Sequence, residues 1–184
     1  MNRAVMIRRA AVVAVSLGLL TLGACASAAR PDAMTVLPST IAAAKAGDVG
    51  YQAVKIVNVS GGTDTNPLLW SEVASGDFRL ALENSLKATG YLGATETAPL
   101  SLTAAMLELK QPMVGLDMSV TSRVRYSVTD ASGKLIFDDT IAATGTAKMG
   151  EAFVGTERLR LANEYAIREN IKAFIERFRT HTAR

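Results

Sequence analysis

The chain is poor in the side chains that most enzymes and metal sites use. Its 184 residues include one cysteine, one histidine and one tryptophan, and aromatic residues make up 5%. A zinc site of cysteine and histidine ligands cannot be assembled from so few, and a lone cysteine excludes an internal disulfide. The only histidine, His181, stands close to the C-terminus, where chains usually fray. We therefore expect no metal, no cofactor and a fold that depends on packing.

Familiar catalytic patterns are also missing. No Gly-x-Ser-x-Gly stretch occurs, and a nucleophilic serine would lack a base beside it. The loop over residues 59–67 lacks the Gly-Lys-Ser/Thr ending of a phosphate-binding loop. Asp138 and Asp139 are the only adjacent carboxylates, and in a strand they point to opposite faces, so they cannot divide acid and base roles. The sequence therefore predicts a protein that is not an enzyme.

The excess of basic residues belongs to the beginning of the chain. The formal net charge is +3, from 20 Lys and Arg against 17 Asp and Glu. Arg3, Arg8 and Arg9 account for this excess, so residues 25–184 carry equal numbers of basic and acidic side chains. Without a general basic field, we expect no nucleic-acid partner.

Residues 1–24 have the three parts of a secretory signal peptide: a cationic start, an apolar run over residues 10–22, and small residues at its end. The apolar run is shorter than the roughly 20 residues that a membrane-spanning helix needs. The remaining 160 residues suffice for one compact domain.

The stretch Leu22-Gly23-Ala24-Cys25 resembles the lipobox of bacterial lipoproteins. The resemblance implies that Cys25 becomes the first residue of the mature protein and carries acyl chains such as palmitate, which hold the protein to a membrane. Cleavage at Ala26-Ser27-Ala28 is the alternative. The same resemblance implies that Ala26, in place of aspartate, directs the protein to the periplasmic face of the outer membrane, with the inner membrane as the other location.

Periodicity predicts a single α+β domain over residues 51–184, after a lipidated N-terminus and flexible tether over residues 25–50. A first strand is expected over residues 51–59 and a helix from Ser71 or Ser75 to Thr89. Three hairpin-connected strands and a terminal helix follow, over residues 100–110, 116–129, 135–147 and 156–179. The order is β-α-β-β-β-α, with both helices packed on one face of a four-stranded, mainly antiparallel sheet.

Two local patterns carry more detailed expectations. The alternation of strand 116–129 predicts a buried Leu116, and a slip in the alternation of strand 100–110 predicts a bulge near Ala104-Ala105. The terminal helix has an apolar stripe through Ile167 and Phe174, and its charged residues, among them Arg160 and Glu164, are expected to cover the opposite, solvated side.

Two phrases in the predicted helices resemble those of small periplasmic lipoproteins of Gram-negative bacteria. They are residues 78–82 leading to Gly90-Tyr91-Leu92, and residues 158–171. The similar families are the auxiliary lipoproteins of lipid-trafficking transporters, the lipopolysaccharide-assembly lipoprotein and the YajG-type lipoproteins. The resemblance implies a non-enzymatic accessory protein that works within an envelope protein complex. The alternative is a carrier that holds a lipid or other apolar ligand between helices and sheet.

One loop is a candidate partner-binding site. The only tryptophan is an amphipathic anchor of the kind found at interfaces, and it ends a loop with turn residues and exposed-looking apolar side chains. The candidate residues are Asp64, Asn66, Leu68, Leu69 and Trp70. The favoured alternative is that the last three cap the core beneath the first helix.

Overall fold

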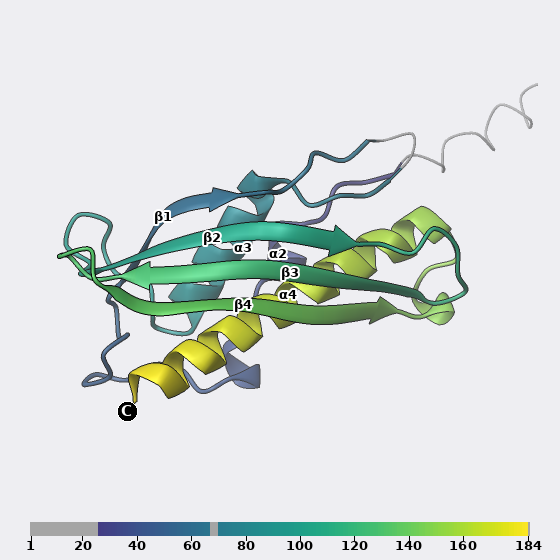
Figure 1. The fold of residues 1–184 in the computed structure, drawn as a ribbon. Helices are drawn as coiled ribbons and strands as arrows, with labels where there is room; N and C mark the ends of the chain where they lie inside the picture. Colours follow the sequence, from purple (N-terminus) through teal and green to yellow (C-terminus); the bar gives the residue numbers. More distant parts are fainter. Residues whose placement is uncertain (1–25, 67–69, 184) are drawn as a thin grey trace, which may run out of the picture.

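A computed structural model describes residues 26–66 and 70–183 of the chain. Four strands form one sheet in the order β1-β2-β3-β4 (Figure 1). Their bounds are Val54–Ser60, Leu100–Lys110, Met118–Thr129 and Leu135–Ala147. β1 pairs with β2 in parallel, whereas the β2–β3 and β3–β4 pairs are antiparallel hairpins. The expected α+β class and the expected order of strands are confirmed, and the sheet is mixed.

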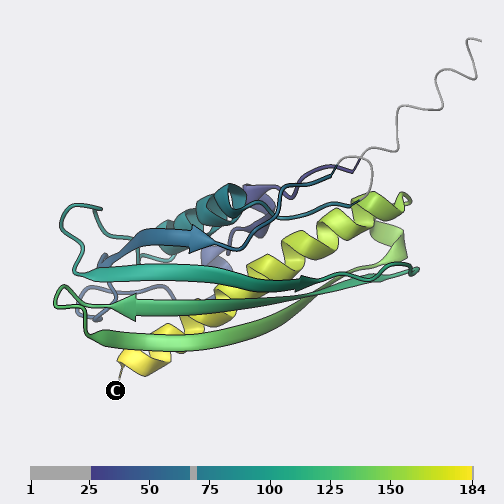
Figure 2. The same cartoon turned by 45° about the horizontal axis from the view of Figure 1, so that its top comes forward.

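Three α-helices in the described part cover one face of the sheet: α2 (Pro31–Met34), α3 (Ser75–Ala88) and α4 (Gly155–Thr182) (Figures 1 and 2). Two 3-10 turns, η2 (Pro38–Thr40) and η3 (Met149–Glu151), lie in the connections. Two helices were expected from the sequence, and α2 is the additional one. It is too short to show a period of its own, and Pro31 starts it.

Prolines, glycines and the alternation of apolar and polar residues determine where most of the helices and strands begin and end. β2 begins and ends at the predicted residues because Pro99 and Pro112 flank it. Gly90 ends α3 with a φ of 79°, a conformation that glycine adopts without strain. β1 begins at Val54, three residues later than expected, because residues 51–53 form a turn. β3 begins at Met118, and Leu116, expected to be buried, is exposed in the loop before it.

The bulge in β2 lies two residues beyond its predicted place. Met106 pairs with Val124 and Glu108 pairs with Arg123, so Leu107 is the extra residue and its side chain is exposed. The prediction near Ala104-Ala105 is therefore wrong by position. The small side chains of Ala104 and Ala105 interrupt the alternation of apolar and polar residues without shifting the pairing of β2. The register of that pairing depends on the partner strand, which the sequence of β2 alone does not specify.

Aromatic rings fill the space between the sheet and α4. Tyr126 of β3 stacks on Phe174, with 4.2 Å between the ring centroids. Phe137 of β4 meets Phe174 and Phe178 edge-on, each at 5.8 Å. Beneath these rings Asn170 accepts a hydrogen bond from the Tyr126 hydroxyl at 2.9 Å. The stripe of α4 predicted to face the sheet is thus confirmed for Ile167 and Phe174.

Candidate functional site

The segment that leads into the domain packs against α3 and α4. Met34 and Val36 are buried, and the backbone N–H of Val36 donates to Ser85 Oγ of α3 at 2.9 Å. Nearer the start, Ser71 Oγ donates to the carbonyl of Ser27 at 2.7 Å. The sequence predicts a flexible tether over residues 25–50, whereas Ala26 and Ala29 are already part of the packed structure. Polar and small residues without a period gave no sign of this packing.

A buried group of charges holds the same segment to α4. Glu164 is fully buried, and its Oε1 accepts hydrogen bonds from the backbone N–H of Arg30 at 2.9 Å and from Arg30 Nε at 3.3 Å. Arg160, also buried, forms ion pairs with Glu164 and Glu157. The expectation that Arg160 and Glu164 lie on a solvated helix face is therefore wrong, because residues 26–36 cover that face.

A second polar cluster joins three parts of the fold at this end. The carbonyl of Ser71 accepts hydrogen bonds from Gln111 Nε2, just after β2, and from Asn163 Nδ2 of α4, both at 2.8 Å. Gln111 Nε2 also donates to Asn163 Oδ1 at 3.2 Å. Burial raises the pKa of the neighbouring Glu72 carboxyl above its usual range. The loop before α3, the end of β2 and the first half of α4 are thereby held together.

Of the predicted partner-binding residues, Asp64, Asn66 and Trp70 are described, and they lie between β1 and α3 beside this cluster. The backbone N–H of Trp70 donates to the carbonyl of Asn66 at 3.1 Å, and Asp64 is exposed. Trp70 is 36% exposed and borders a shallow hollow of about 210 Å³ with Glu72, Leu109, Gln111 and Met113. Leu68 and Leu69 lie outside the described residues. Of the candidates, the structure brings Asn66 and Trp70 together.

Two further loops at this end expose apolar side chains that sequence analysis missed. One joins β2 to β3 and carries Met113, Val114 and Leu116; the other joins β4 to α4 and carries Met149, Phe153 and Val154. Asp117 connects the loops, because its Oδ1 accepts the backbone N–H of Met149 at 2.9 Å. The available signal was an apolar run within a turn, Met113-Val114-Gly115-Leu116, which the alternation argument assigned in part to β3.

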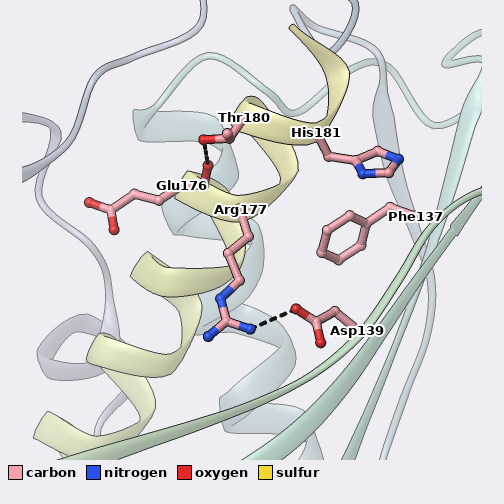
Figure 3. A pocket seen from close by; sticks show the side chains of 6 residues that line it. All are labelled: Phe137, Asp139, Glu176, Arg177, Thr180 and His181. Carbon is pink, nitrogen blue, oxygen red and sulfur yellow. Dashed lines mark hydrogen bonds and ion pairs between the residues drawn. The ribbon is translucent and has the colours of Figure 1, made fainter. Parts of the chain in front are cut away.

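A hollow of about 330 Å³ lies at the other end of α4, beside β4 (Figure 3). Arg177 Nη1 and Asp139 Oδ2 form an ion pair of 2.7 Å, and the His181 ring meets Phe137 edge-on at 5.7 Å. Thr180 Oγ1 donates to the Glu176 carbonyl. His181 lies within α4 and not in a frayed tail. Among the described residues, no hydrogen bond or ion pair joins His181 to Asp139 or Glu176, the two carboxylates that line this hollow.

The adjacent carboxylates point to opposite faces of β4, as the sequence predicts. Asp139 pairs with Arg177 on the helix side, whereas Asp138 pairs with Arg125 at 2.7 Å on the open face. Hydrogen bonds from Arg125 and Ser127 lower the pKa of Asp138 to about 2. Both groups therefore act as ion-pair partners.

A groove of about 530 Å³ lies between residues 42–50 and the end of α4. Tyr91 borders it, and burial raises the pKa of its hydroxyl, which has no hydrogen-bond partner among the described residues. In that same part of the chain, no three acidic, histidine or cysteine side chains gather as metal ligands would. None of the helices described combines the length and the apolar character required to cross a bilayer.

Comparisons with known proteins identify the fold. No protein-family model and no curated protein sequence matches the chain. Among solved structures, a Xanthomonas campestris protein of the family DUF330 has a TM-score of 0.57 at 11% identity, covering 84% of this chain and 96% of its own. A minor lipoprotein from Acinetobacter baumannii has a TM-score of 0.46 at 12% identity, covering 71% and 94%. A lipoprotein candidate from Caulobacter crescentus has a TM-score of 0.47 at 14% identity, covering 70% and 90%. The Xanthomonas likeness shows a shared fold.

Proposed function

We propose that this chain is a lipid-anchored, non-enzymatic accessory protein of the bacterial cell envelope. The observation that carries the proposal is the stretch Leu22-Gly23-Ala24-Cys25, which in the sequence stands directly before Ala26, the first described residue and a buried one. Acyl chains on Cys25 would attach the domain to a bilayer without any spanning helix. The proposed location is the periplasmic face of the outer membrane.

The non-enzymatic part of the proposal rests on how the polar residues are used. The carboxylates Asp138, Asp139 and Glu164 are engaged by arginines, and His181 lies against an aromatic ring. A general base must reach a substrate proton, and a nucleophile must have such a base beside it. The described residues offer pairs that stabilise the fold and exposed surfaces that suit contacts with a partner.

The proposed partner is an envelope protein complex, reached through the exposed polar residues Asp64 and Asn66 of the loop between β1 and α3. This loop is tied to β2 and α4 through Ser71, so it is a positioned surface. The relationship in fold to the Xanthomonas DUF330 protein supports a small domain of this architecture. The alternative, a carrier with a lipid between helices and sheet, gains no support because stacked rings such as Tyr126 and Phe174 fill that layer.

Two measurements test the proposal. Intact mass and labelling with radioactive palmitate should show fatty acid on the protein extracted from membranes, and Cys25→Ala should abolish the label. Crosslinking in intact cells should then recover a defined envelope protein, and substitution of Asp64→Ala should weaken that crosslink relative to Leu135→Ala at the distant β3–β4 turn. Wild-type protein without fatty acid would remove the anchor, and a lipidated protein that crosslinks to nothing would remove the accessory role.

A further inference from the structure

We infer that the apolar end of the domain rests on the membrane surface itself, beside the anchor. The apolar end is defined by the exposed side chains of Trp70, Met113, Val114, Leu116, Met149, Phe153 and Val154. This inference depends on the proposed acylation of Cys25, and it adds an orientation and a lipid-contacting surface to it.

Exposure of apolar side chains is concentrated at this end. Phe153 is 93% exposed, Val114 86% and Met113 81%. Among the described residues, fourteen large apolar side chains are exposed, and half of them belong to the apolar end. Scattered exposed apolar residues are normal, but a concentration of this kind marks a surface for interaction with a membrane or another molecule.

The chain enters the domain at the same end. The first described residues, the loop after β2 and the beginning of α4 lie together, opposite the β3–β4 turn (Figures 1 and 2). Hydrogen bonds link them in order: Ser27 accepts from Ser71, and Ser71 accepts from Gln111, two residues before Met113. The entry point and the apolar end are therefore held in one rigid arrangement.

No slack chain separates the predicted anchor from this surface. Ala26 is only 6% exposed, and its neighbour Ser27 is fixed by a hydrogen bond of 2.7 Å. Cys25 is bonded to Ala26, and consecutive Cα atoms are about 3.8 Å apart. Acyl chains on Cys25 would therefore leave from the domain surface, and membrane insertion would bring the apolar end to the bilayer. Because the anchor already confines the domain, the apolar contacts need not meet the entropic cost of association.

The chemistry of this end suits a bilayer more than a protein groove. Methionine, valine, leucine and phenylalanine side chains stand on short loops, and Trp70 is of the type that sits at the headgroup level. Exposed Lys110 and Lys148 border the loops and can meet anionic headgroups. The nearby acids Asp117 and Glu151 are exposed, and their carboxylates accept hydrogen bonds from the backbone N–H groups of Met149 and Lys148.

The test places a single fluorescent reporter at each end of the lipidated, full-length mature protein. In a Trp70→Phe background, Phe153→Trp reports on the apolar end and Leu135→Trp on the exposed β3–β4 turn. Each protein is reconstituted in phosphatidylethanolamine and phosphatidylglycerol vesicles whose acyl chains carry bromine, a quencher of tryptophan. We expect about a twofold or larger loss of fluorescence at position 153, because interfacial side chains sit roughly 5–10 Å into the headgroup and acyl boundary. Fluorescence at position 135 should stay unchanged.

The outcomes separate the inference from the proposed function. Acylated protein that floats with the vesicles but is quenched equally little at both positions would overturn the inference and assign the apolar end to a protein partner. Wild-type protein without acyl mass would overturn the anchor, and the orientation with it. Trp70 of the unaltered protein provides a second measurement that needs no substitution, and it should also be quenched by the brominated lipid.

Discussion

The backbone N–H of Arg30 donates a hydrogen bond of 2.9 Å to Oε1 of Glu164, whose side chain is fully buried. The two residues are 134 positions apart, and their contact joins the start of the domain to its last helix. Arg160 forms an ion pair with the same carboxylate from within α4. A buried carboxylate is tolerated because several donors converge on it.

Replacement of Glu164 by alanine should destabilise the domain and release its entry segment. Arg160 would remain buried with Glu157 as its one carboxylate partner, and the Arg30 backbone N–H would lose its acceptor. We expect the free energy of unfolding to fall by roughly 3 kcal/mol, the lower end of the range for a broken buried pair. Urea denaturation measures this loss, and faster hydrogen exchange at Arg30 reports the release.

Glu169→Ala is the matched control, because Glu169 lies on the exposed side of the same helix. It should change the unfolding free energy by no more than about 0.5 kcal/mol. Equal effects of the two substitutions would contradict the role given to Glu164.

Substitution of Asn170 should cost more than its size suggests. Its Nδ2 donates to the carbonyl of Ile141 at 2.9 Å and to Ser122 Oγ at 3.1 Å, and its Oδ1 accepts from the Tyr126 hydroxyl. Asn170→Ala removes the acceptor of the buried Tyr126 hydroxyl, at about 1–3 kcal/mol, and the side-chain donor to the Ile141 carbonyl, whereas Ser122 Oγ keeps its hydrogen bonds to the carbonyls of Ala143 and Ala166. Thermal denaturation should therefore show a larger loss for Asn170→Ala than for Tyr126→Phe, which removes one hydrogen bond. The reverse order would contradict the network.

Gly145 is a point of close approach between β4 and α4. A Cβ built there would lie 2.2 Å from the backbone nitrogen of Ala166, so α4 would have to shift. We expect Gly145→Ala to lower the free energy of unfolding by about 1–3 kcal/mol through overpacking. Gly150→Ala is the control, since a Cβ at Gly150 meets nothing within 4 Å. Guanidinium denaturation measures the free energy of unfolding of both variants. Equal values for Gly145→Ala and Gly150→Ala would contradict the close approach of Gly145 to Ala166.

The ion pair of Asp138 with Arg125 should make stability depend on acid pH. The pKa of Asp138 falls from 3.8 to about 2 in the folded protein, so its contribution is complete above pH 3.8 and is lost as the pH falls toward 2. Asp138→Asn should reduce the slope of unfolding free energy against pH in this window. Ser127→Ala removes one of the three hydrogen bonds to the Asp138 carboxylate and should keep part of the slope. An unchanged slope in Asp138→Asn would show that other carboxyls govern it.

Local sequence patterns predicted the parts of the fold that depend on local physics. Strands β2 and β4 have the predicted bounds because prolines, a turn and regular alternation define them. The stop of α3 at Gly90 follows from a backbone conformation that glycine adopts readily. The stripe of α4 follows from helical periodicity. Among the residues of the apolar end, the sequence singled out only Trp70 as a candidate contact residue, since a lone tryptophan in a loop is visible in a sequence and a cluster of loops is not.

Contacts between segments that are distant in the sequence decided which charges are buried and which loops lie together. From the sequence, Arg160 and Glu164 are expected on a solvated helix face, but residues 26–36 pack over them and bury them. The periodicity of neither segment indicates this packing. The apolar end gathers Trp70, Met113 and Phe153 from three separate connections, which only the register of the sheet and the course of α4 bring to one place. Burial and proximity are properties of the folded chain, because each depends on which surface a segment meets and not on its own composition.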